Sequence, residues 1–229
     1  MRIIFVRHSH PNYEKDCLTP LGHLHAKAAA QRLKDEGICR IYSSTCGRAL
    51  ETAQHTADLL GLPVTSFDYM REITWGTAQG EPLPYDAHPW DTVDAMVAQG
   101  QNLMDADWKQ QEPFRRNTLI PLTQRIETSL DQLLEAEGYT REGNFYRVTG
   151  ENPDHTIAIF SHGGSSSVML GHLFNLPFPF VCAAMGPDYT AITIAALGSQ
   201  QGKLLSPHFE LMNDARHIRG LEIGNYFGK

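Results

Sequence analysis

The chain has 229 residues, of which 41% are hydrophobic and 20% are charged, so it is long and apolar enough to bury a substantial core. This composition excludes a disordered tail, a collagen-like rod and a small scaffold held together by disulfides. Lys and Arg number 19 against 26 Asp and Glu, which gives a net charge of −7 and argues against a nucleic-acid partner. Any anion site must therefore be a local cluster of cations.

Neither the cysteines nor the apolar runs indicate a metal site, an export signal or a membrane span. The four cysteines form no C-x-x-C pair, which gives no support for a zinc ribbon. The apolar run at residues 3–6 is far too short for a signal peptide, and the run at 191–197 is too short to cross a bilayer. We therefore expect a cytoplasmic protein without a membrane partner, a metal or another cofactor. No pattern in the sequence indicates its oligomeric state.

Short apolar runs alternate with helical patterns over the first 60 residues. Residues 3–6 and residues 38–43 each predict a short buried strand of the kind found in parallel sheets. Between them, Thr19 and Pro20 are a typical helix start, because Thr caps the free N–H groups and Pro fits the first turn. A second helix is expected at about residues 44–60. The apolar face of the first helix is expected to hold Leu21, Leu24, Ala28 and Leu33.

The middle of the chain, residues 74–121, differs in composition and is rich in Pro, Gly, Trp and acidic residues. Helical patterns are present at residues 91–99 and again at 102–109. Such a segment is typical of an insertion rather than of core structure. We expect it to form a cap over a functional site, within one domain that spans residues 1–229.

The second half of the chain returns to the alternation of helices and strands. The predicted elements, in order, are an amphipathic helix at 122–137, a hairpin at 139–148, a buried strand at 156–160, a helix that ends at 174, and strands at 189–197 and 208–212. The whole pattern predicts an α/β fold, a three-layer sandwich with a mostly parallel central sheet.

Two of the predicted strands run directly into turns that contain histidine. Arg7-His8 follows the first strand, and Ser161-His162-Gly163-Gly164 follows the strand at 156–160. If these strands are neighbours, the two histidines face each other at the edge of the sheet where α/β proteins bind ligands. Arg48 lies in the first turn of a helix that also follows a strand, so its guanidinium is expected at the same edge.

This set of residues is suited to a tetrahedral dianion. The planar guanidinium groups of Arg7 and Arg48 match phosphate oxygens two at a time. The Gly163-Gly164 pair lets backbone N–H groups approach an anion closely at a helix N-terminus, where the helix dipole is positive. The residues therefore indicate a phosphate site.

The ordered motifs of the chain resemble those of the histidine phosphatase superfamily, whose fold is phosphoglycerate-mutase-like. These motifs are Arg7-His8, then Leu18-Thr19 with Gly22 and Ala26, then Ser43-Ser44 with Arg48-Ala49 and Thr52-Ala53, then Glu72-Ile73 with Gly76, and finally Ser161-His162-Gly163-Gly164. Each motif is short, but together they follow the family order over residues 3–175, broken by the 74–121 segment.

The resemblance implies a metal-independent phosphomonoesterase that acts on a small phosphorylated metabolite. His8 would attack phosphorus and form a phosphohistidine, which water then hydrolyses. Glu72 would protonate the leaving alcohol as a general acid, which implies an acid optimum. The phosphate would be held by Arg7, Arg48, His162 and Gly163. Side chains that we expect to contact the rest of the substrate are Ser9, Asn12, Tyr13, Arg115 and Arg116.

The chain departs from the family pattern at two positions near the nucleophile. Ser9 stands where the family usually has Gly, so its side chain is expected to crowd the phosphate or to donate a hydrogen bond to it. Glu14 stands where many members have Asn, although Asn12 is nearby. Patterns typical of the glycolytic mutases are missing, so we favour net hydrolysis over phosphoryl transfer.

Two other functions of the same fold stay open. The chain could be a cofactor-dependent phosphoglycerate mutase, or a catalytically weak protein that binds a phosphorylated ligand, which Ser9 suggests. Two other classes of hydrolase are excluded because the sequence lacks their motifs. A nucleophile elbow G-x-S-x-G fails because position 167 is Ser167, and no cysteine is followed six residues later by Arg, as a thiol phosphatase requires.

Overall fold

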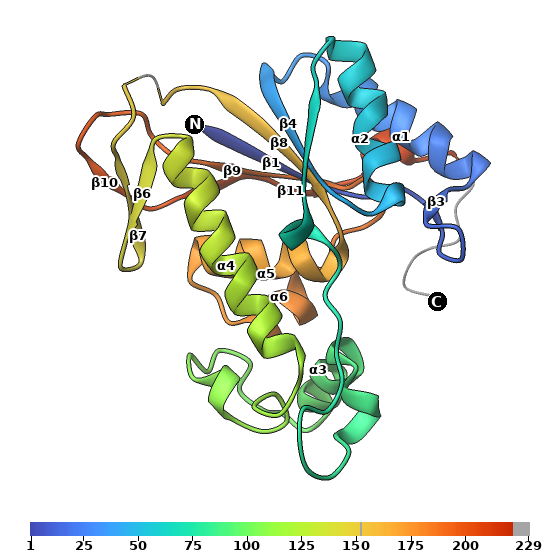
Figure 1. The fold of residues 1–229 in the computed structure, drawn as a ribbon, viewed down its shortest axis with the longest axis vertical. Helices are drawn as coiled ribbons and strands as arrows, with labels where there is room; N and C mark the ends of the chain where they lie inside the picture. Colours follow the sequence, from blue (N-terminus) through green and yellow to red (C-terminus); the bar gives the residue numbers. More distant parts are fainter. Residues whose placement is uncertain (152, 222–229) are drawn as a thin grey trace.

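A computed structural model describes residues 1–151 and 153–221. Its central sheet consists of β1 (Arg2–Arg7), β4 (Ile38–Ser44), β5 (Val64–Phe67), β8 (Thr156–Ser161), β9 (Ile192–Ala196) and β11 (His208–Asp214). The six strands lie in the order β11-β9-β1-β8-β4-β5 (Figure 1). The run β1-β8-β4-β5 is parallel, whereas β9 pairs antiparallel with both of its neighbours. The predicted mostly parallel sheet is confirmed.

Helices cover both faces of this sheet. They are α1 (Pro20–Leu33), α2 (Gly47–Leu60), α4 (Leu119–Ala136), α5 (Gly163–Phe174) and α6 (Phe178–Ala184). Figure 1 shows α1 and α2 on one face and α4, α5 and α6 on the other. The three-layer sandwich predicted from the sequence is therefore confirmed.

The central strands are apolar throughout because both of their faces are covered. In β1, Ile3 and Phe5 belong to the core beneath α4 and α5, whereas Ile4 and Val6 belong to the core beneath α1 and α2. Side chains of a strand point alternately to opposite faces, so a strand between two helical layers needs apolar residues at every position. The strand β1 consequently holds the residue that follows it, His8, in a fixed place.

The helix boundaries follow the expected local signals, with one correction. Thr19 caps α1, accepting a hydrogen bond from the N–H of Gly22 at 3.0 Å, and α2 ends at Gly61 in the left-handed conformation. The second helix was expected to start at Ser44 or Thr45, but α2 begins at Gly47. The Ser44 hydroxyl instead accepts the N–H of Cys46, so the chain turns before the helix starts.

The apolar face predicted for α1 is wrong at Leu24, which is 55% exposed. The helix lies next to α2, and its buried residues include the small Ala26, Ala29 and Ala30 together with His25. The buried face of α1 is therefore formed mainly by small residues and Leu33, and Leu24 lies outside it.

Residues 76–118 leave the sandwich as a lobe that is closed at its base by an antiparallel bridge between Thr77 and Asn117. The lobe contains α3 (Pro89–Ala98), close to the predicted helix at 91–99. The helix predicted at 102–109 is wrong, since only a single 3₁₀ turn, η3 (Trp108–Gln110), forms there. Figure 1 shows the lobe beyond the helices α4 and α6. That it caps the functional site stays a prediction.

The remaining elements are short. The predicted hairpin is confirmed and consists of β6 (Tyr139–Glu142) and β7 (Phe145–Val148), joined by β10 (Leu204–Leu205) into a small sheet. A second hairpin, β2 (Pro11–Asn12) with β3 (Cys17–Leu18), follows β1 and has no counterpart in the sequence analysis. The further 3₁₀ turns are η1 (Asp68–Met70), η2 (Pro84–Ala87) and η4 (Arg216–Ile218).

Taken one at a time, the described helices are all too short or too polar to cross a membrane. Among the described helices, only α5 and α6 taken together are long and apolar enough for a membrane span, and the two are bent by 120° relative to each other. Nearly all residues of α5 are buried inside the protein.

Candidate active site

The carboxyl ends of β1 and β8 bring the two strand-end histidines together. The strands pair in parallel with Arg7 opposite Ser161, so the residues that follow each strand lie side by side. The ring centroids of His8 and His162 are 5.1 Å apart. Arg7, His8 and His162 are all buried, with at most 4% of their surface exposed. These residues form the centre of the candidate site.

His8 is held in the form that a nucleophile requires. Its Nδ1 lies 2.8 Å from the carbonyl oxygen of Ser9, and because a carbonyl only accepts, Nδ1 carries the proton. The lone pair is therefore on Nε2. Burial, followed by the positive charges of Arg7 and Arg48, lowers the pKa of His8 to about 3. The imidazole is therefore neutral at neutral pH.

His162 caps the N-terminus of α5 and faces His8 with one ring nitrogen unused. Its Nε2 lies 2.8 Å from the hydroxyl of Ser44 at the end of β4. Its Nδ1 is buried and has no hydrogen-bond partner among the described residues. Burial and the neighbouring His8, Arg48 and Arg7 hold the pKa of His162 well below its usual value. A buried nitrogen without a partner is costly unless a ligand satisfies it.

Two guanidinium groups flank the histidines, and each rests on a tyrosine ring. Arg7 donates to the carbonyl of Pro187 at 2.8 Å, and its Cζ lies 4.5 Å from the ring centroid of Tyr189. The Cζ of Arg48 lies 5.4 Å from the ring of Tyr13. The Nε of Arg48 is buried and has no partner in the part of the chain that the structure describes.

Asp16, in the β2–β3 hairpin, forms an ion pair with Nη1 of Arg48 and accepts the N–H of Gly47 at 2.8 Å. Sequence reasoning missed this residue. Asp16 lies just before the Leu18-Thr19 motif, but no spacing links it to an arginine more than thirty positions away. Its position depends on the conformation of a hairpin that the sequence analysis did not predict.

Glu72 lies at the N-terminus of α5. One carboxyl oxygen accepts the N–H groups of Ile73, Gly164 and Ser165 at 3.0, 2.9 and 3.1 Å. Burial raises the pKa of Glu72 and outweighs these hydrogen bonds and the charge of Arg7. The carboxyl group therefore keeps its proton to a higher pH than an ordinary glutamate.

Of the two glycines at the start of α5, Gly164 makes this arrangement sterically feasible. A β-carbon on Gly163 would lie 3.9 Å from both Arg7 Cζ and the second carboxyl oxygen of Glu72, which is ordinary contact, so Arg7 and Glu72 both lie next to this glycine. A β-carbon on Gly164 would lie 2.4 Å from the Ile73 side chain and 2.7 Å from Glu72. The sequence predicted that the Gly164 N–H faces an anion, and here the Glu72 carboxyl group takes that place.

The expected substrate contacts are only partly brought to the site. Tyr13 is 62% exposed and lies edge-on to His8, with a centroid distance of 6.3 Å. The Ser9 hydroxyl is buried and donates to the carbonyl of Gly22 at 2.6 Å, so its proton is directed away from the phosphate that it was expected to crowd or bind. The Asn12 side chain accepts the N–H of Lys15 within the hairpin.

Arg115 and Arg116 lie in the lobe, where both form ion pairs with Glu112. Arg116 also donates to the carbonyls of Gln79 and Glu81, which ties two segments of the lobe together. Within the described residues, neither arginine forms a hydrogen bond or ion pair with the strand-end groups. Their prediction as substrate contacts has no support from this geometry.

Among the described residues, no group of three or more His, Cys, Asp and Glu side chains is arranged to hold a metal ion. The strand-end site instead concentrates positive charge around a neutral imidazole. Such a site can bind a tetrahedral anion and can attack its central atom.

The chain is similar to known proteins in both sequence and fold. The chain is 26% identical over 163 residues to a probable phosphoglycerate mutase of Yersinia pestis; the match covers 70% of this chain and 64% of that relative, less than two thirds of its length. Two solved structures share the fold. A mycobacterial glucosyl-3-phosphoglycerate phosphatase superposes with a TM-score of 0.64 at 23% identity, covering 93% of this chain and 98% of that one. A phosphoserine phosphatase mutant from Entamoeba histolytica has a TM-score of 0.61 at 22% identity, covering 95% and 98%.

A family model for the histidine phosphatase superfamily (branch 1) matches residues 3–209. The match includes both strand-end turns and the helix starts between them, where the sequence motifs first suggested the resemblance. We conclude that the chain belongs to the histidine phosphatase superfamily, branch 1.

Proposed function

We propose that the protein is a phosphomonoesterase that works through a phosphohistidine at His8 and hydrolyses a small phosphorylated metabolite. The observation that carries this proposal is the neutral His8 imidazole, with its Nε2 lone pair unprotonated, beside the two arginines and the buried Nδ1 of His162. A cytoplasmic location stays a prediction.

In the first step, Nε2 of His8 attacks phosphorus and the bond from phosphorus to the ester oxygen breaks. Glu72 gives its proton to that oxygen, so the alcohol leaves neutral. In the second step, water attacks phosphorus while Glu72 takes a proton from it, and the P–N bond breaks. The products are the alcohol and inorganic phosphate, and both His8 and Glu72 return to their starting forms.

Arg7, Arg48 and His162 would hold the oxygens of the phosphoryl group through both steps. Phosphoryl transfer requires mainly positioning and electrostatic stabilisation, and these side chains supply both. The buried Nε of Arg48 and Nδ1 of His162 lack partners that phosphate oxygens would provide. This is why we favour a phosphate ester over other anions.

The comparisons support two variants of this chemistry. The solved structures named above are phosphatases of small phosphorylated molecules, which favours hydrolysis. The sequence relative is a probable phosphoglycerate mutase, which favours transfer to a second hydroxyl. The mutase is our second candidate. We favour the third alternative, a catalytically weak protein that binds a phosphorylated ligand, least. Ser9 suggested it, and the Ser9 hydroxyl donates to the carbonyl of Gly22.

The test is to measure phosphate release from p-nitrophenyl phosphate and from a panel of phosphorylated hydroxy acids and sugars, in EDTA. We expect turnover that is lost in His8→Ala and a phosphorylated protein that is stable in base and labile in acid. His23→Ala, an exposed histidine on α1, is the matched control and should keep its activity. Turnover that persists in His8→Ala would contradict the proposal, and transfer that outruns hydrolysis when a bisphosphorylated primer is added would place the mutase first.

A further inference from the structure

The Asp16 carboxylate bridges two parts of the phosphate site. One oxygen pairs with Nη1 of Arg48, and the other accepts the N–H of Gly47, the first residue of α2, at 2.8 Å. A carboxylate at this place binds both the side chain and the helix start from which the side chain extends. It therefore restricts the guanidinium relative to the backbone that carries it.

Asp16 itself is held firmly. A β-carbon on Gly47 would lie 2.1 Å from the Asp16 carbonyl oxygen, so the hairpin and the start of α2 are in direct backbone contact. Two residues further on, the N–H of Leu18 donates to Glu51 of α2 at 2.7 Å. Asp16 has a φ of +47°, a left-handed conformation that Asp adopts more readily than most residues. The backbone of Asp16 is therefore fixed beside the start of α2, within reach of Arg48.

The ion pair leaves the opposite edge of the guanidinium for a ligand. The side chain of Asp16 is 40% exposed and that of Arg48 is 11% exposed, so Asp16 lies toward solvent and Arg48 toward the buried site. On that inner side the charge of Arg48 acts on both His8 and His162. Nε of Arg48 is buried there and has no partner within residues 1–151 and 153–221.

Charge alone does not explain why an acidic residue belongs beside a phosphate-binding arginine. Burial raises the pKa of Asp16, but the hydrogen bonds from Gly47 and Arg48 outweigh it and lower the pKa overall, so the carboxylate stays charged. Its negative charge offsets part of the attraction between Arg48 and a phosphate. Its contribution must therefore be orientation, which in a flexible arginine side chain is costly to fix at the moment of binding.

We propose that Asp16 is a positioning residue for phosphoryl transfer, which holds Arg48 so that its inner edge meets the phosphoryl oxygens at His8. The inference rests on the proposed function. The β2–β3 hairpin, which also carries Tyr13 beside His8 and Arg48, would then take part in the reaction through Asp16.

The test is a double-mutant cycle that combines Asp16→Ala with Arg48→Ala. We expect Asp16→Ala alone to lower kcat/KM for p-nitrophenyl phosphate about tenfold, mainly through kcat, because a misplaced group costs most in the transition state. In the Arg48→Ala background the same change should cost less than about twofold, since there is no guanidinium left to orient. Asp16→Asn can still accept the N–H of Gly47, so its kcat/KM should lie between the values of the unmodified protein and of Asp16→Ala.

A matched control is Asp35→Asn, an exposed aspartate in the turn after α1, which should leave kcat/KM unchanged. Thermal unfolding of every variant separates orientation from folding. An equal loss of kcat/KM in both backgrounds, or no loss in either, would overturn the proposal. An Asp16→Ala variant that unfolds is replaced in the cycle by Asp16→Asn.

The affinity for orthophosphate keeps this test distinct from that of the proposed function. If the unmodified protein shows no turnover that depends on His8, the proposed hydrolase function is contradicted. The same double-mutant cycle can then be measured through the affinity for orthophosphate, by phosphorus NMR titration. Asp16→Ala should then weaken phosphate binding only when Arg48 is present. Tighter binding in Asp16→Ala would show instead that the carboxylate merely competes with phosphate for Arg48, and would overturn the positioning role.

Discussion

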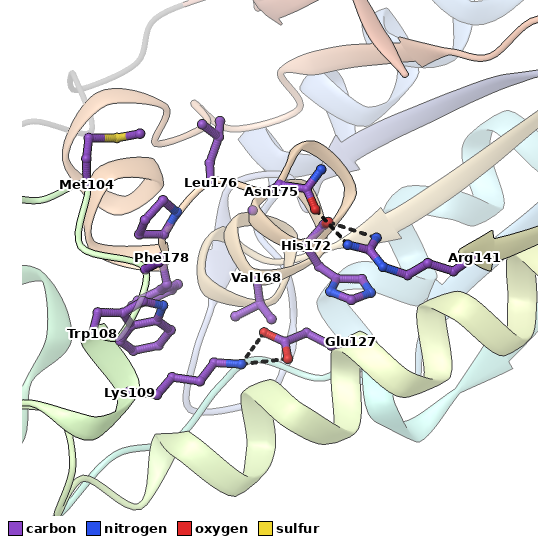
Figure 2. A pocket seen from close by; sticks show the side chains of 13 residues that line it. Met104, Trp108, Lys109, Glu127, Arg141, Val168, His172, Asn175, Leu176 and Phe178 are labelled. Atoms are coloured by element: carbon purple, nitrogen blue, oxygen red, sulfur yellow. Dashed lines mark hydrogen bonds and ion pairs between the residues drawn. The ribbon is translucent and has the colours of Figure 1, made fainter. Parts of the chain in front are cut away.

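Two regions of the protein differ in how their polar groups are satisfied. One is the strand-end site around His8. The other, which we call the lobe pocket, lies between the lobe, α4 and α5 and has a volume of about 330 Å³ (Figure 2). Figure 2 shows apolar side chains of Met104, Trp108 and Phe178 on one side of this pocket and the polar Arg141 on the other.

The polar side chains of the lobe pocket already have partners. Lys109 forms an ion pair with Glu127 at 2.6 Å, and Arg141 donates to Asn175 at 2.7 Å and to the carbonyl of His172 at 3.1 Å. His172 is itself paired with an aspartate on α4. In the residues that the structure describes, none of the buried polar atoms without a partner belongs to this pocket.

The strand-end site is the reverse case, since Arg48 Nε and His162 Nδ1 are buried there without partners. Leaving such groups unsatisfied costs stability, so a fold retains them where a ligand completes the hydrogen bonds. Of the two regions, the strand-end site is the one that leaves buried nitrogens for a ligand to satisfy, whereas the polar groups of the lobe pocket are satisfied by one another. The predictions below separate the two regions on this basis.

The largest effect is expected for Arg48→Ala. The change removes the donor with the unsatisfied nitrogen, and losing contacts to a developing oxyanion costs about 10²–10³-fold in kcat. Steady-state kinetics with p-nitrophenyl phosphate measure this, and Arg125→Ala, an exposed arginine on α4, is the control that should keep full activity. A loss below about tenfold would mean that Arg48 does not contact the phosphate.

The next effect is expected for Glu72→Gln. A general acid acts while it is protonated, and the pKa of Glu72 is raised. The value of kcat/KM should therefore stay high at pH values above the pKa of an ordinary glutamate, and fall as the pH rises through the raised pKa of Glu72. On the acid side, His8 becomes protonated only near its pKa of about 3. A glutamine side chain cannot titrate or donate a proton in this way, so Glu72→Gln should remove the alkaline limb and lower the rate by about 10²-fold.

Leaving-group chemistry sharpens this prediction. An alkyl phosphate needs the proton from Glu72, whereas p-nitrophenolate leaves without it, so the loss in Glu72→Gln should be much smaller for the aryl ester. Comparing variant and unmodified protein on the same substrate cancels the titration of the substrate itself. Equal losses on both esters, with an unchanged pH profile, would show that Glu72 is not the acid.

The assembly of the strand-end groups could be anticipated from the sequence, because it follows from topology. A strand that ends in Arg7-His8 and a parallel neighbour that ends in Ser161-His162 must deliver those residues to one edge. Arg48 follows from the same rule, since it lies in the first turn of the helix that follows β4. The roles assigned to these residues stay predictions that the experiments above test.

The features that sequence reasoning missed depend on conformations that spacing does not encode. Asp16 reaches Arg48 only because a short hairpin turns through a left-handed residue and packs on α2. Ser9 was expected to face the phosphate, but the close approach of α1 offers its hydroxyl the carbonyl of Gly22. Leu24 was expected in the core, but the buried face of α1 is formed mainly by small residues and Leu33. In each case the position of the side chain depends on tertiary packing, which the local sequence pattern does not determine.

The smallest effect on activity is expected for Lys109→Met in the lobe pocket. The change removes the partner of Glu127, and because both side chains are about one-fifth exposed it should lower the free energy of unfolding by about 1 kcal/mol. Urea unfolding measures this, and the double variant Lys109→Met with Glu127→Gln should recover part of the loss. If the lobe pocket is structural, kcat/KM for phosphate esters stays within about twofold of the unmodified protein. A selective rise in KM for one phosphorylated metabolite would instead show that this pocket contributes to substrate binding, and the contrast between the two regions would then fail.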